Sequence, residues 1–502
     1  MARVFFVVLF AIASLQAHAI EWSSKVHRNL QIETAAGSSA DILVFLGPKA
    51  SLEKAETIID RGQRLQFVYR QLTYHAEKSQ AALIQFLQKK GLTYQSFYIN
   101  NSLLVENATP DLIQELAQFP EVALISLNLK VRLKLPPPTT VAVSFNRPKE
   151  DDVEDNLKQI HADKVWNELG VRGEGIVVAG GDSGFKFDHP ALSHQYRGYG
   201  IKKDQHKYNW HDAIHHSASV GDGSSCPPNR PAPCDDMGHG THTMGIMLGY
   251  DSAGATNHIG VAPKAKWVGC RNMNGGVGKP STYLECFQYF LAPYPEGGNP
   301  AKDGKPQFAP HVINNSWGCP LDEGCTGREF IQAIDNVQAA GILVVVSAGN
   351  DGPGCQTVAE APATQSAKVL AVGSYNAYEG DASYFSSRGP SSLDGSLAPN
   401  ISAPGDAIRS SVPSGGMGDD GLYDVMSGTS MAGPHVAGAV ALLWSAHPAL
   451  IGNIPATRAI LEKTAQPKTS DQDCGSFSGR KVPNAVFGYG VVDAYAAIKS
   501  VH

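Results

Sequence analysis

The sequence predicts an α/β fold: a doubly wound, mostly parallel sheet covered by helices, preceded by a small α+β unit. The second half of the chain holds several short runs that are continuously apolar, as in strands buried on both faces of a parallel sheet. Segments with helical periodicity lie between these runs. A Pro-rich segment at residues 135–140 separates this part from an N-terminal part with a different pattern.

Composition narrows the class of protein. The chain has 502 residues, 42% hydrophobic and 18% charged, which is typical of a globular protein and is enough for about three domains. The formal net charge of −6 argues against a basic nucleic-acid binder and against an acidic disordered protein.

The N-terminus has the pattern of a secretory signal peptide at residues 1–19. Arg3 precedes an apolar run at 4–15, and a small-residue cleavage motif ends at Ala19. The run is shorter than the ~20 residues that a membrane span needs, and no second run of that length follows. We therefore expect a secreted protein, extracellular or periplasmic in transit, with no membrane association after signal removal; a buried N-terminal element is the alternative.

Residues 41–131 read as the small α+β unit. Its expected elements are strands at 41–46, 102–106 and 122–127 and helices at 77–89 and 111–118. Thr109 is a plausible cap for the last helix, with Pro110 at its first position. The unit holds no chemically suggestive cluster, which favours a folding or inhibitory module.

The larger unit follows the linker. Its expected strands are 175–180, 311–314, 342–346 and 369–372, and its expected helices include 326–340 and 431–446. In doubly wound sheets, functional sites collect at the carboxyl ends of the strands.

Three junctions between these elements carry reactive side chains. Asp182 directly follows an apolar strand and is flanked by glycines. His239 and His242 stand in a second Gly-rich segment, and Ser430 lies at a glycine turn that opens a long apolar helix. Each has a simpler interpretation when taken alone: a turn Asp, a pair of metal-ligating histidines and a helix cap.

Together the three junctions occur in the order Asp, His, Ser, which is the order in subtilisin. A serine hydroxyl needs a base to take its proton, and an imidazole needs a carboxylate to hold its tautomer. Asn350 follows the strand at 342–346, where a side-chain amide can donate to an oxyanion; an ordinary turn residue is the alternative.

Over roughly residues 156–498 the chain resembles the subtilisin-like serine proteases, and within them most closely the bacillopeptidase F-like group. The segments that carry the resemblance are 182–184, 239–242, 269–273, 284–287, 314–319, 347–355, 386–390 and 428–435. The joint match of these segments is very specific.

The resemblance implies a role for each candidate residue. It implies catalytic Asp182, His239 (rather than His242) and Ser430, the oxyanion donor Asn350 beside the Ser430 N–H, primary-pocket residues Ser316, Trp317 and Gly318, and Gly275 and Gly276 as backbone partners of an extended substrate. It also implies that residues 41–131 form an inhibitory prodomain. We therefore expect a propeptide at 20–138, cut between Val131 and Asp155, and a catalytic domain at 139–502.

The expected function is a secreted serine endopeptidase made as a self-processed zymogen. Its partners would be protein or peptide substrates and its own prodomain as intramolecular inhibitor, with no nucleic acid and a monomeric state. Catalysis would need no cofactor; the family often binds structural calcium, but no ligand set can be mapped. A catalytically inert binding or chaperone module on the same fold is the alternative, and a metallopeptidase is disfavoured because no H-E-x-x-H occurs.

Two features depart from the family pattern. Gly181 precedes the Asp where an aliphatic residue is usual. The long loop at 204–233 contains four histidines, which we interpret as a solvated polar loop rather than a metal site.

Eight cysteines fit disulfides in an exported protein. Short spacing predicts the pairs Cys226–Cys234 and Cys319–Cys325 and leaves the other four open: Cys270, Cys286, Cys355 and Cys474.

Overall fold

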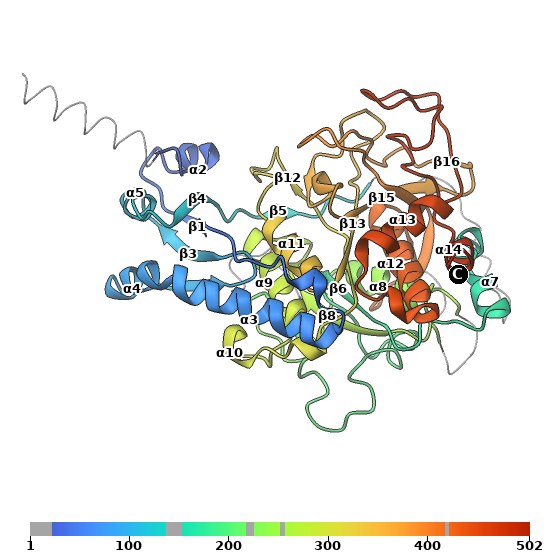
Figure 1. Ribbon diagram of the computed structural model, residues 1–502, viewed down its shortest axis with the longest axis horizontal. Coiled ribbons are helices and arrows are strands. Elements are labelled where there is room, and N and C mark those ends of the chain that lie inside the picture. Colours follow the sequence, from blue (N-terminus) through green and yellow to red (C-terminus); the bar gives the residue numbers. More distant parts are fainter. Residues whose placement is uncertain (1–22, 137–152, 217–224, 252–256, 417–420, 502) are drawn as a thin grey trace, which may run out of the picture.

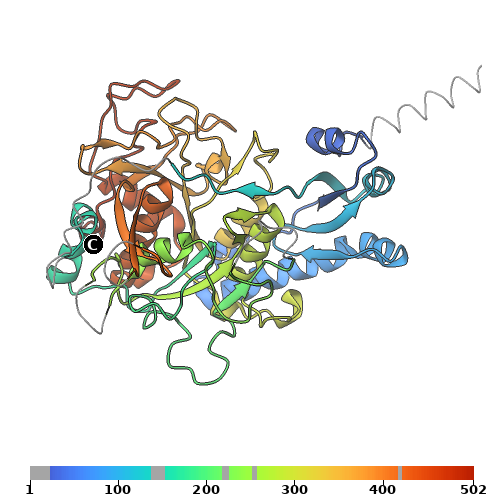
Figure 2. The same ribbon diagram turned by 180° about the vertical axis from the view of Figure 1, so that it is seen from behind.

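The structure, a computed structural model, describes residues 23–136, 153–216, 225–251, 257–416 and 421–501 (Figure 1). The predicted signal peptide at 1–19 and the linker residues 137–140 lie outside these ranges. A small N-terminal unit projects from one side of a larger α/β unit, and both views show the same arrangement (Figures 1 and 2).

The N-terminal unit is an antiparallel sheet with strand order β2-β3-β1-β4 and helices packed against it. Its elements are α2 (Arg28–Glu33), β1 (Ala40–Leu46), α3 (Arg61–Ser79), α4 (Ala81–Lys89), β2 (Tyr94–Phe97), β3 (Ser102–Ala108), α5 (Pro110–Ala117) and β4 (Val122–Leu127). The three predicted strands are confirmed. The hydroxyl of Thr109 accepts a hydrogen bond from the Leu112 N–H, as expected of a cap.

The predicted helix at 77–89 is wrong at its start. The chain forms two helices that meet at Gln80, because α3 begins 16 residues earlier, at Arg61, and ends at Ser79. Asp60 caps α3 by accepting from the Gln63 N–H, and an apolar stripe that includes Leu65 and Leu72 is buried. In Figure 1, α3 runs from the N-terminal unit along the larger unit.

The larger unit is built on a central sheet in which the pairings from β7 to β15 and the pairing of β17 with β15 are parallel. The strand order is β16-β15-β13-β11-β6-β8-β7, with β17 beside β15, and only β16 is antiparallel. The strands are β6 (Val177–Asp182), β7 (Trp210–Asp212), β8 (Lys266–Arg271), β11 (Val312–Asn315), β13 (Leu343–Ser347), β15 (Leu370–Asn376), β16 (Asp381–Ala382) and β17 (Ile401–Pro404). The predicted fold class is thereby confirmed.

Helices cover both faces of this sheet. On one face Ile313 and Val344 pack in the cluster that contains α9 (Pro280–Leu291) and α11 (Ile331–Ala339). On the other face Val312 and Val345 pack in the cluster that contains α8 (His239–Leu248) and α12 (Thr429–Ala446). The continuous apolar runs in the sequence follow from this burial on both sides. The predicted helix at 326–340 begins only at Ile331.

The N-terminal unit ends with the short strand β5 (Val131–Arg132). The remaining elements of the larger unit are α6 (Asp155–Gln159), α7 (Ala162–Glu168), β9 (Met273–Asn274), β10 (Val277–Gly278), α10 (Pro300–Asp303), β12 (Cys319–Pro320), β14 (Glu360–Ala361), β18 (Ile408–Ser411), β19 (Tyr423–Met426), α13 (Ile454–Thr464) and α14 (Ala494–Lys499). Within the described ranges no helix is both long and apolar enough to cross a membrane.

Disulfides cross-link the larger unit. The predicted pairs Cys226–Cys234 and Cys319–Cys325 are confirmed, and the four remaining cysteines form Cys270–Cys286 and Cys355–Cys474.

The N-terminal unit docks on the outer side of α9. Leu43 and Leu104 of its sheet share one buried cluster with Leu284 of α9. At the turn after β2, the side-chain oxygen of Gln288 accepts a hydrogen bond from the Tyr98 N–H at 2.7 Å.

Candidate active site

Asp182 stands at the carboxyl end of β6, in the middle of the sheet. Its Oδ1 accepts hydrogen bonds from the Ser183 N–H at 2.7 Å and from His239 Nδ1 at 2.8 Å. Both Asp182 and His239 are 1% exposed. Because Nδ1 donates to Asp182, Nε2 is the ring nitrogen left to accept a proton.

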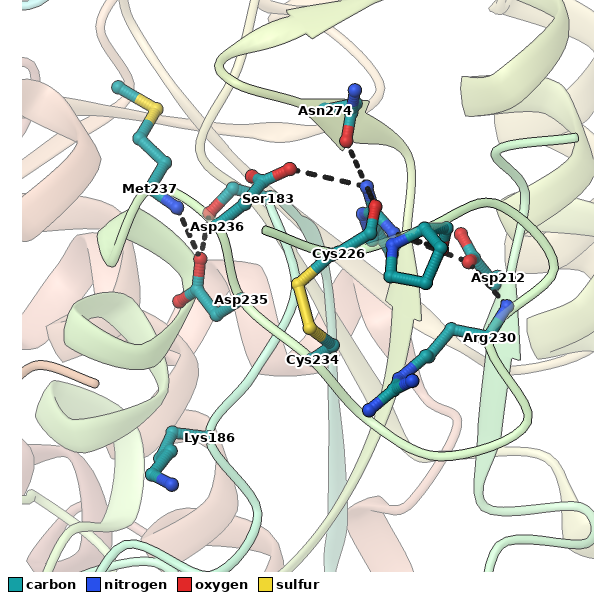
Figure 3. The surroundings of a disulfide bond; sticks show 12 residues. Ser183, Lys186, Asp212, Cys226, Arg230, Cys234, Asp235, Asp236, Met237 and Asn274 are labelled. Carbon is teal, nitrogen blue, oxygen red and sulfur yellow. Dashed lines mark hydrogen bonds and ion pairs between the residues drawn. A yellow bond between two sulfur atoms is a disulfide. The ribbon is translucent and has the colours of Figure 1, made fainter. Parts of the chain in front are cut away.

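The N-terminus of α8 is fixed by Asp235, which the sequence did not single out. Its Oδ1 accepts from the Ser183 hydroxyl at 2.9 Å and from the Gly238 N–H at 2.8 Å, and its Oδ2 accepts from the Thr241 N–H at 3.0 Å. Figure 3 shows Asp235 next to the Cys226–Cys234 disulfide and bonded to the Met237 N–H. This carboxylate caps the helix that carries His239 and ties that helix to the residue after Asp182.

The two histidines of this segment differ in environment. Burial acts to lower the pKa of His239, but the charge of Asp182 and its hydrogen bond outweigh burial, so the pKa lies above the ordinary value. Within the described residues His239 Nε2 has no hydrogen-bond partner. Burial lowers the pKa of His242 to about 3, and its Nε2 donates to the Ile408 carbonyl at 3.1 Å. His242 therefore has a structural role.

Ser430 lies in the first turn of α12, which packs against α8. Pro434 is four residues further along and has no N–H, so the Ser430 carbonyl lacks its usual helical donor. The hydroxyl of Ser316 donates to that carbonyl at 3.0 Å. The Ser430 hydroxyl in turn donates to the Ser316 carbonyl at 3.3 Å. Ser316 is thus a support for Ser430.

Thr429 fixes the orientation of Asn350. The N–H and the hydroxyl of Thr429 both donate to Asn350 Oδ1 at 2.9 Å. Oδ1 is therefore the acceptor, and Nδ2 is left to donate on the other side. Thr429 belongs to the motif around Ser430, but its role depends on where its side chain lies, which the sequence does not give.

The end of the N-terminal unit lies in the same site. β5 pairs antiparallel with β10, which in turn pairs with β9. Beyond β5 the Leu133 N–H donates to the Gly276 carbonyl at 2.8 Å. The Lys134 carbonyl then accepts a hydrogen bond from Asn350 Nδ2 at 3.0 Å. This part of the chain is bound as an added strand.

The predicted substrate-contacting residues fall into two groups. Trp317 and Gly318 line a pocket around Lys134, and Gly276 supplies a backbone carbonyl to the added strand. Gly275 lies in the same turn but donates its N–H to Asp236 Oδ1 at 3.0 Å. Trp317, Gly318 and Gly276 therefore border the bound strand. Ser316, which bonds to Ser430, and Gly275 do not.

A buried ion-pair cluster supports the hairpin formed by β9 and β10. Arg271 is fully buried and contacts Asp212 Oδ2 at 3.3 Å and Asp236 Oδ2 at 3.2 Å. It also donates to the Cys226 carbonyl at 2.9 Å and to the Asn274 side chain. Because Asp236 also holds the Gly275 N–H, the cluster links the disulfide loop to the hairpin that pairs with the bound strand.

The interpretation of the loop at 204–233 as solvated is wrong for its central histidines. His211 is buried, stacks on the ring of Tyr289 and contacts Glu285 at 2.7 Å. His215 contacts the same carboxylate at 2.9 Å. Gln95 of the N-terminal unit donates to Glu285 at 2.7 Å, so the cluster lies under the docked unit. Within the described part of the chain no three His, Cys, Asp or Glu side chains are grouped to hold a metal ion.

The fold, the hydrogen-bonded Asp182–His239 pair and the strand added beside β10 all point to one class of protein. Residues 173–490, more than half of the chain, match the Subtilase family, and the chain belongs to this family. The predicted family of subtilisin-like serine proteases is thereby confirmed.

Individual relatives of this chain support the same family assignment. Bacillopeptidase F of Bacillus subtilis (strain 168) is 36% identical over 471 residues, which cover 90% of this chain but only 30% of that protein. Subtilisin DY of Bacillus licheniformis is 33% identical over 240 residues, which cover 47% of this chain and 74% of the relative. Serine protease AprX of Bacillus subtilis is 28% identical over 379 residues, 70% and 73% of the two chains. The predicted likeness to bacillopeptidase F is confirmed, although the chain spans about a third of that relative's length.

Proposed function

We propose that this chain is a serine endopeptidase, made as a secreted zymogen that processes itself. Ser430 is the nucleophile, His239 the general base and Asp182 the carboxylate that orients the imidazole. The bond from His239 Nδ1 to Asp182 at 2.8 Å supports the last two roles. The predicted signal peptide at residues 1–19 supports secretion.

Peptide hydrolysis then takes two steps. The Ser430 oxygen adds to the carbonyl carbon of the scissile bond while its proton passes to His239 Nε2. Asn350 Nδ2 donates to the oxygen that becomes negative. His239 returns the proton to the leaving nitrogen, the C–N bond breaks, and an ester to Ser430 remains. Water attacks this ester with His239 again as base, which releases the new carboxylate and restores Ser430.

The observation that carries this proposal is the hydrogen bond from Asn350 Nδ2 to the Lys134 carbonyl at 3.0 Å. A backbone carbonyl lies where the oxyanion donor would act, in a strand that pairs with β10 as a substrate would. The same contacts support an inhibitory role for the N-terminal unit, because a substrate cannot enter while this strand is bound. We place the propeptide before a cut between Val131 and Asp155 and the catalytic domain after it, as the sequence predicts.

The test is labelling with diisopropyl fluorophosphate, read by intact mass. We expect one phosphoryl adduct on a shortened wild-type chain, mapped to Ser430 by peptide mass, and hydrolysis of unfolded protein substrates. The Ser430→Ala variant should stay full length, unlabelled and inactive. Ser445→Ala is a matched control, because Ser445 lies near the other end of the same helix and donates to the Glu174 carbonyl.

Two results would contradict the proposal. A folded, shortened wild-type chain that takes up no label and cleaves no protein would support an inert module instead. A Ser430→Ala variant that still hydrolyses protein would remove Ser430 from the reaction.

A further inference from the structure

We infer that the primary specificity pocket selects Lys or Arg through Glu360, and that the chain is first cut between Lys134 and Leu135. This inference rests on the proposed serine endopeptidase function. It adds the substrate class and a specificity-determining residue that the family resemblance does not supply.

The position of Lys134 identifies the pocket. Its carbonyl is the one that Asn350 Nδ2 holds, so its carbonyl carbon is the one that Ser430 would attack. The side chain of that residue occupies the primary pocket of a protease. The pocket around Lys134 is lined by Trp317, Gly318 and Glu360, among others.

Carboxylates surround the Lys134 ammonium. Nζ lies 3.7 Å from Asp322 Oδ2 and 3.9 Å from Glu323 Oε1. Asp351 and Glu360 add further negative charge near it. Burial acts to lower the pKa of Lys134, but these four carboxylates outweigh it and raise the pKa, which means that the pocket favours the charged ammonium.

Glu360 forms a wall of this pocket. Its strand β14 pairs antiparallel with β12, so that Glu360 lies opposite Pro320. Its carboxylate fills the space beside Gly318, where a Cβ would come within 1.8 Å of Glu360 Oε2. Only a glycine at position 318 leaves room for the carboxylate in this place.

The charge of Glu360 depends on pH. Burial raises the pKa of Glu360, the neighbouring charge of Asp351 and a hydrogen bond with Asp351 raise it further, and the charge of Lys134 opposes them only in part, so the pKa is about 8. Above that pH, an apolar side chain in this pocket would leave charged carboxylates facing one another without a cation. Discrimination against apolar residues then comes from repulsion as well as from the attraction of Lys or Arg.

The acidic residues near Lys134 differ in exposure and in place. The Asp322 side chain is 77% exposed, so solvent and salt screen its charge. Glu360 is half-buried and, unlike Asp322, Glu323 and Asp351, lines the pocket, so it is the residue that we assign as the determinant.

The same geometry locates the first cut. The Lys134–Leu135 C–N bond breaks, and water supplies a hydroxyl to the Lys134 carbonyl carbon and a proton to the Leu135 nitrogen. The new N-terminus is then Leu135, four residues before the domain start that the sequence predicts at 139. The site lies inside the expected window between Val131 and Asp155.

The test compares peptides that differ only in the residue before the scissile bond: Lys, Arg, Leu or Phe. For the processed wild type, assayed above the Glu360 pKa of about 8, we expect kcat/KM to be at least ~10-fold higher for Lys and Arg than for Leu and Phe. Glu360→Gln should lose most of this preference without losing activity on Leu. The exposed Glu379→Gln is the matched control and should keep the wild-type preference, while Asp322→Asn should reduce it by no more than about threefold.

Labelling of every variant with diisopropyl fluorophosphate separates the proposed serine endopeptidase function from the assignment of the pocket. A labelled wild-type enzyme that cleaves all four peptides equally would overturn the pocket assignment and leave the proposed function intact. A preference that survives in Glu360→Gln would overturn the role of Glu360. A wild type that neither labels nor cleaves would overturn both claims.

A second variant tests the pocket without altering it. Lys134→Leu in an otherwise wild-type chain should slow self-processing at least ~10-fold, whereas Lys134→Arg should process at the wild-type rate. Equal rates for Leu and Arg would contradict the inference even if Glu360→Gln failed to fold.

Discussion

The hydroxyl of Thr429 fixes which side of the Asn350 amide faces the bound carbonyl. Thr429→Val removes one of the two hydrogen bonds to Asn350 Oδ1 and keeps the side-chain shape. We expect kcat to fall about three- to tenfold with little change in KM, because the donor acts mainly on the developing oxyanion. Steady-state kinetics on a neutral peptide measure this.

The matched control is Thr429→Ser, which keeps the hydroxyl and should restore kcat. Asn350→Ala removes the donor itself and should lower kcat by about 10²–10³, the range that this kind of donor carries in subtilisin. An unchanged kcat in Thr429→Val would show that the backbone N–H alone holds the amide.

The pH dependence follows from His239. The imidazole must be neutral to take the Ser430 proton, so activity is lost as pH falls through its pKa. Because the charge of Asp182 outweighs burial, that pKa lies above the ordinary 6.5. We expect the acid limb of kcat/KM, measured between about pH 5 and about pH 9, to have its midpoint above 6.5. A flat profile for an enzyme that stays folded, as judged by circular dichroism, would contradict this role.

At the scale of single residues, the sequence singled out four candidate residues and missed the side chains that hold them in place. Asp182, His239, Ser430 and Asn350 stand out because each follows a strand or opens a helix in a Gly-rich segment. Asp235 lies four residues before His239, but its capping of α8 depends on side-chain direction, which spacing does not reveal.

The loop at 204–233 likewise shows that sequence spacing does not reveal which side chains are buried. A polar run has no periodicity from which burial can be read, and the partner of His211, Glu285, lies 74 residues away on α9.

At the scale of elements, α9 is the surface on which the N-terminal unit, the proposed prodomain, docks. Gln288 on this helix accepts from the Tyr98 N–H at 2.7 Å and the Ile99 N–H at 3.4 Å. Gln288→Ala leaves both buried donors unpaired, which costs about 1–3 kcal/mol. We expect the cleaved prodomain to inhibit this variant at least about fivefold more weakly, measured as an inhibition constant with the wild-type prodomain.

The exposed Gln307→Ala serves as the control and should bind the prodomain as the wild type does. Hydrolysis of a small peptide by Gln288→Ala, free of prodomain, should be unchanged. An inhibition constant equal to that of the wild type would show that this contact does not hold the prodomain.

The buried strands of the central sheet were predicted from the sequence, whereas α3 and β5 were not. Continuous apolar runs identified β6, β11, β13 and β15, because burial on both faces of the sheet leaves a strong signal. Most of α3 was missed because polar residues on its other faces outnumber the apolar residues of its buried stripe. β5 is two residues long and exists only because β10 offers it a partner, so no local pattern marks it.

At the scale of the whole molecule, the Cys355–Cys474 disulfide joins positions 119 residues apart. Closing so long a loop constrains the unfolded chain by about 5 kcal/mol, against about 2 kcal/mol for the six-residue separation of Cys319–Cys325. In a Ser430→Ala background, which prevents self-digestion, alanine at both ends of the long-range bond should lower the free energy of unfolding more than the same change at the short-range bond. Denaturant unfolding compares the two, and an equal or reversed order would contradict the expectation.

The overall architecture could be predicted, but the relation between its two units could not. Strand type and element order follow from local pattern and from right-handed parallel connections. The contact of Lys134 with Asn350 joins residues 216 positions apart and depends on how the N-terminal unit docks.

The most direct test of the central claim is an intact-mass time course on freshly folded wild-type and Ser430→Ala chains. We expect the wild type to split after Lys134 into two fragments that remain associated, while Ser430→Ala stays a single chain. A Ser430→Ala chain that splits at the same bond and rate, with no other protease present, would contradict self-processing by this site.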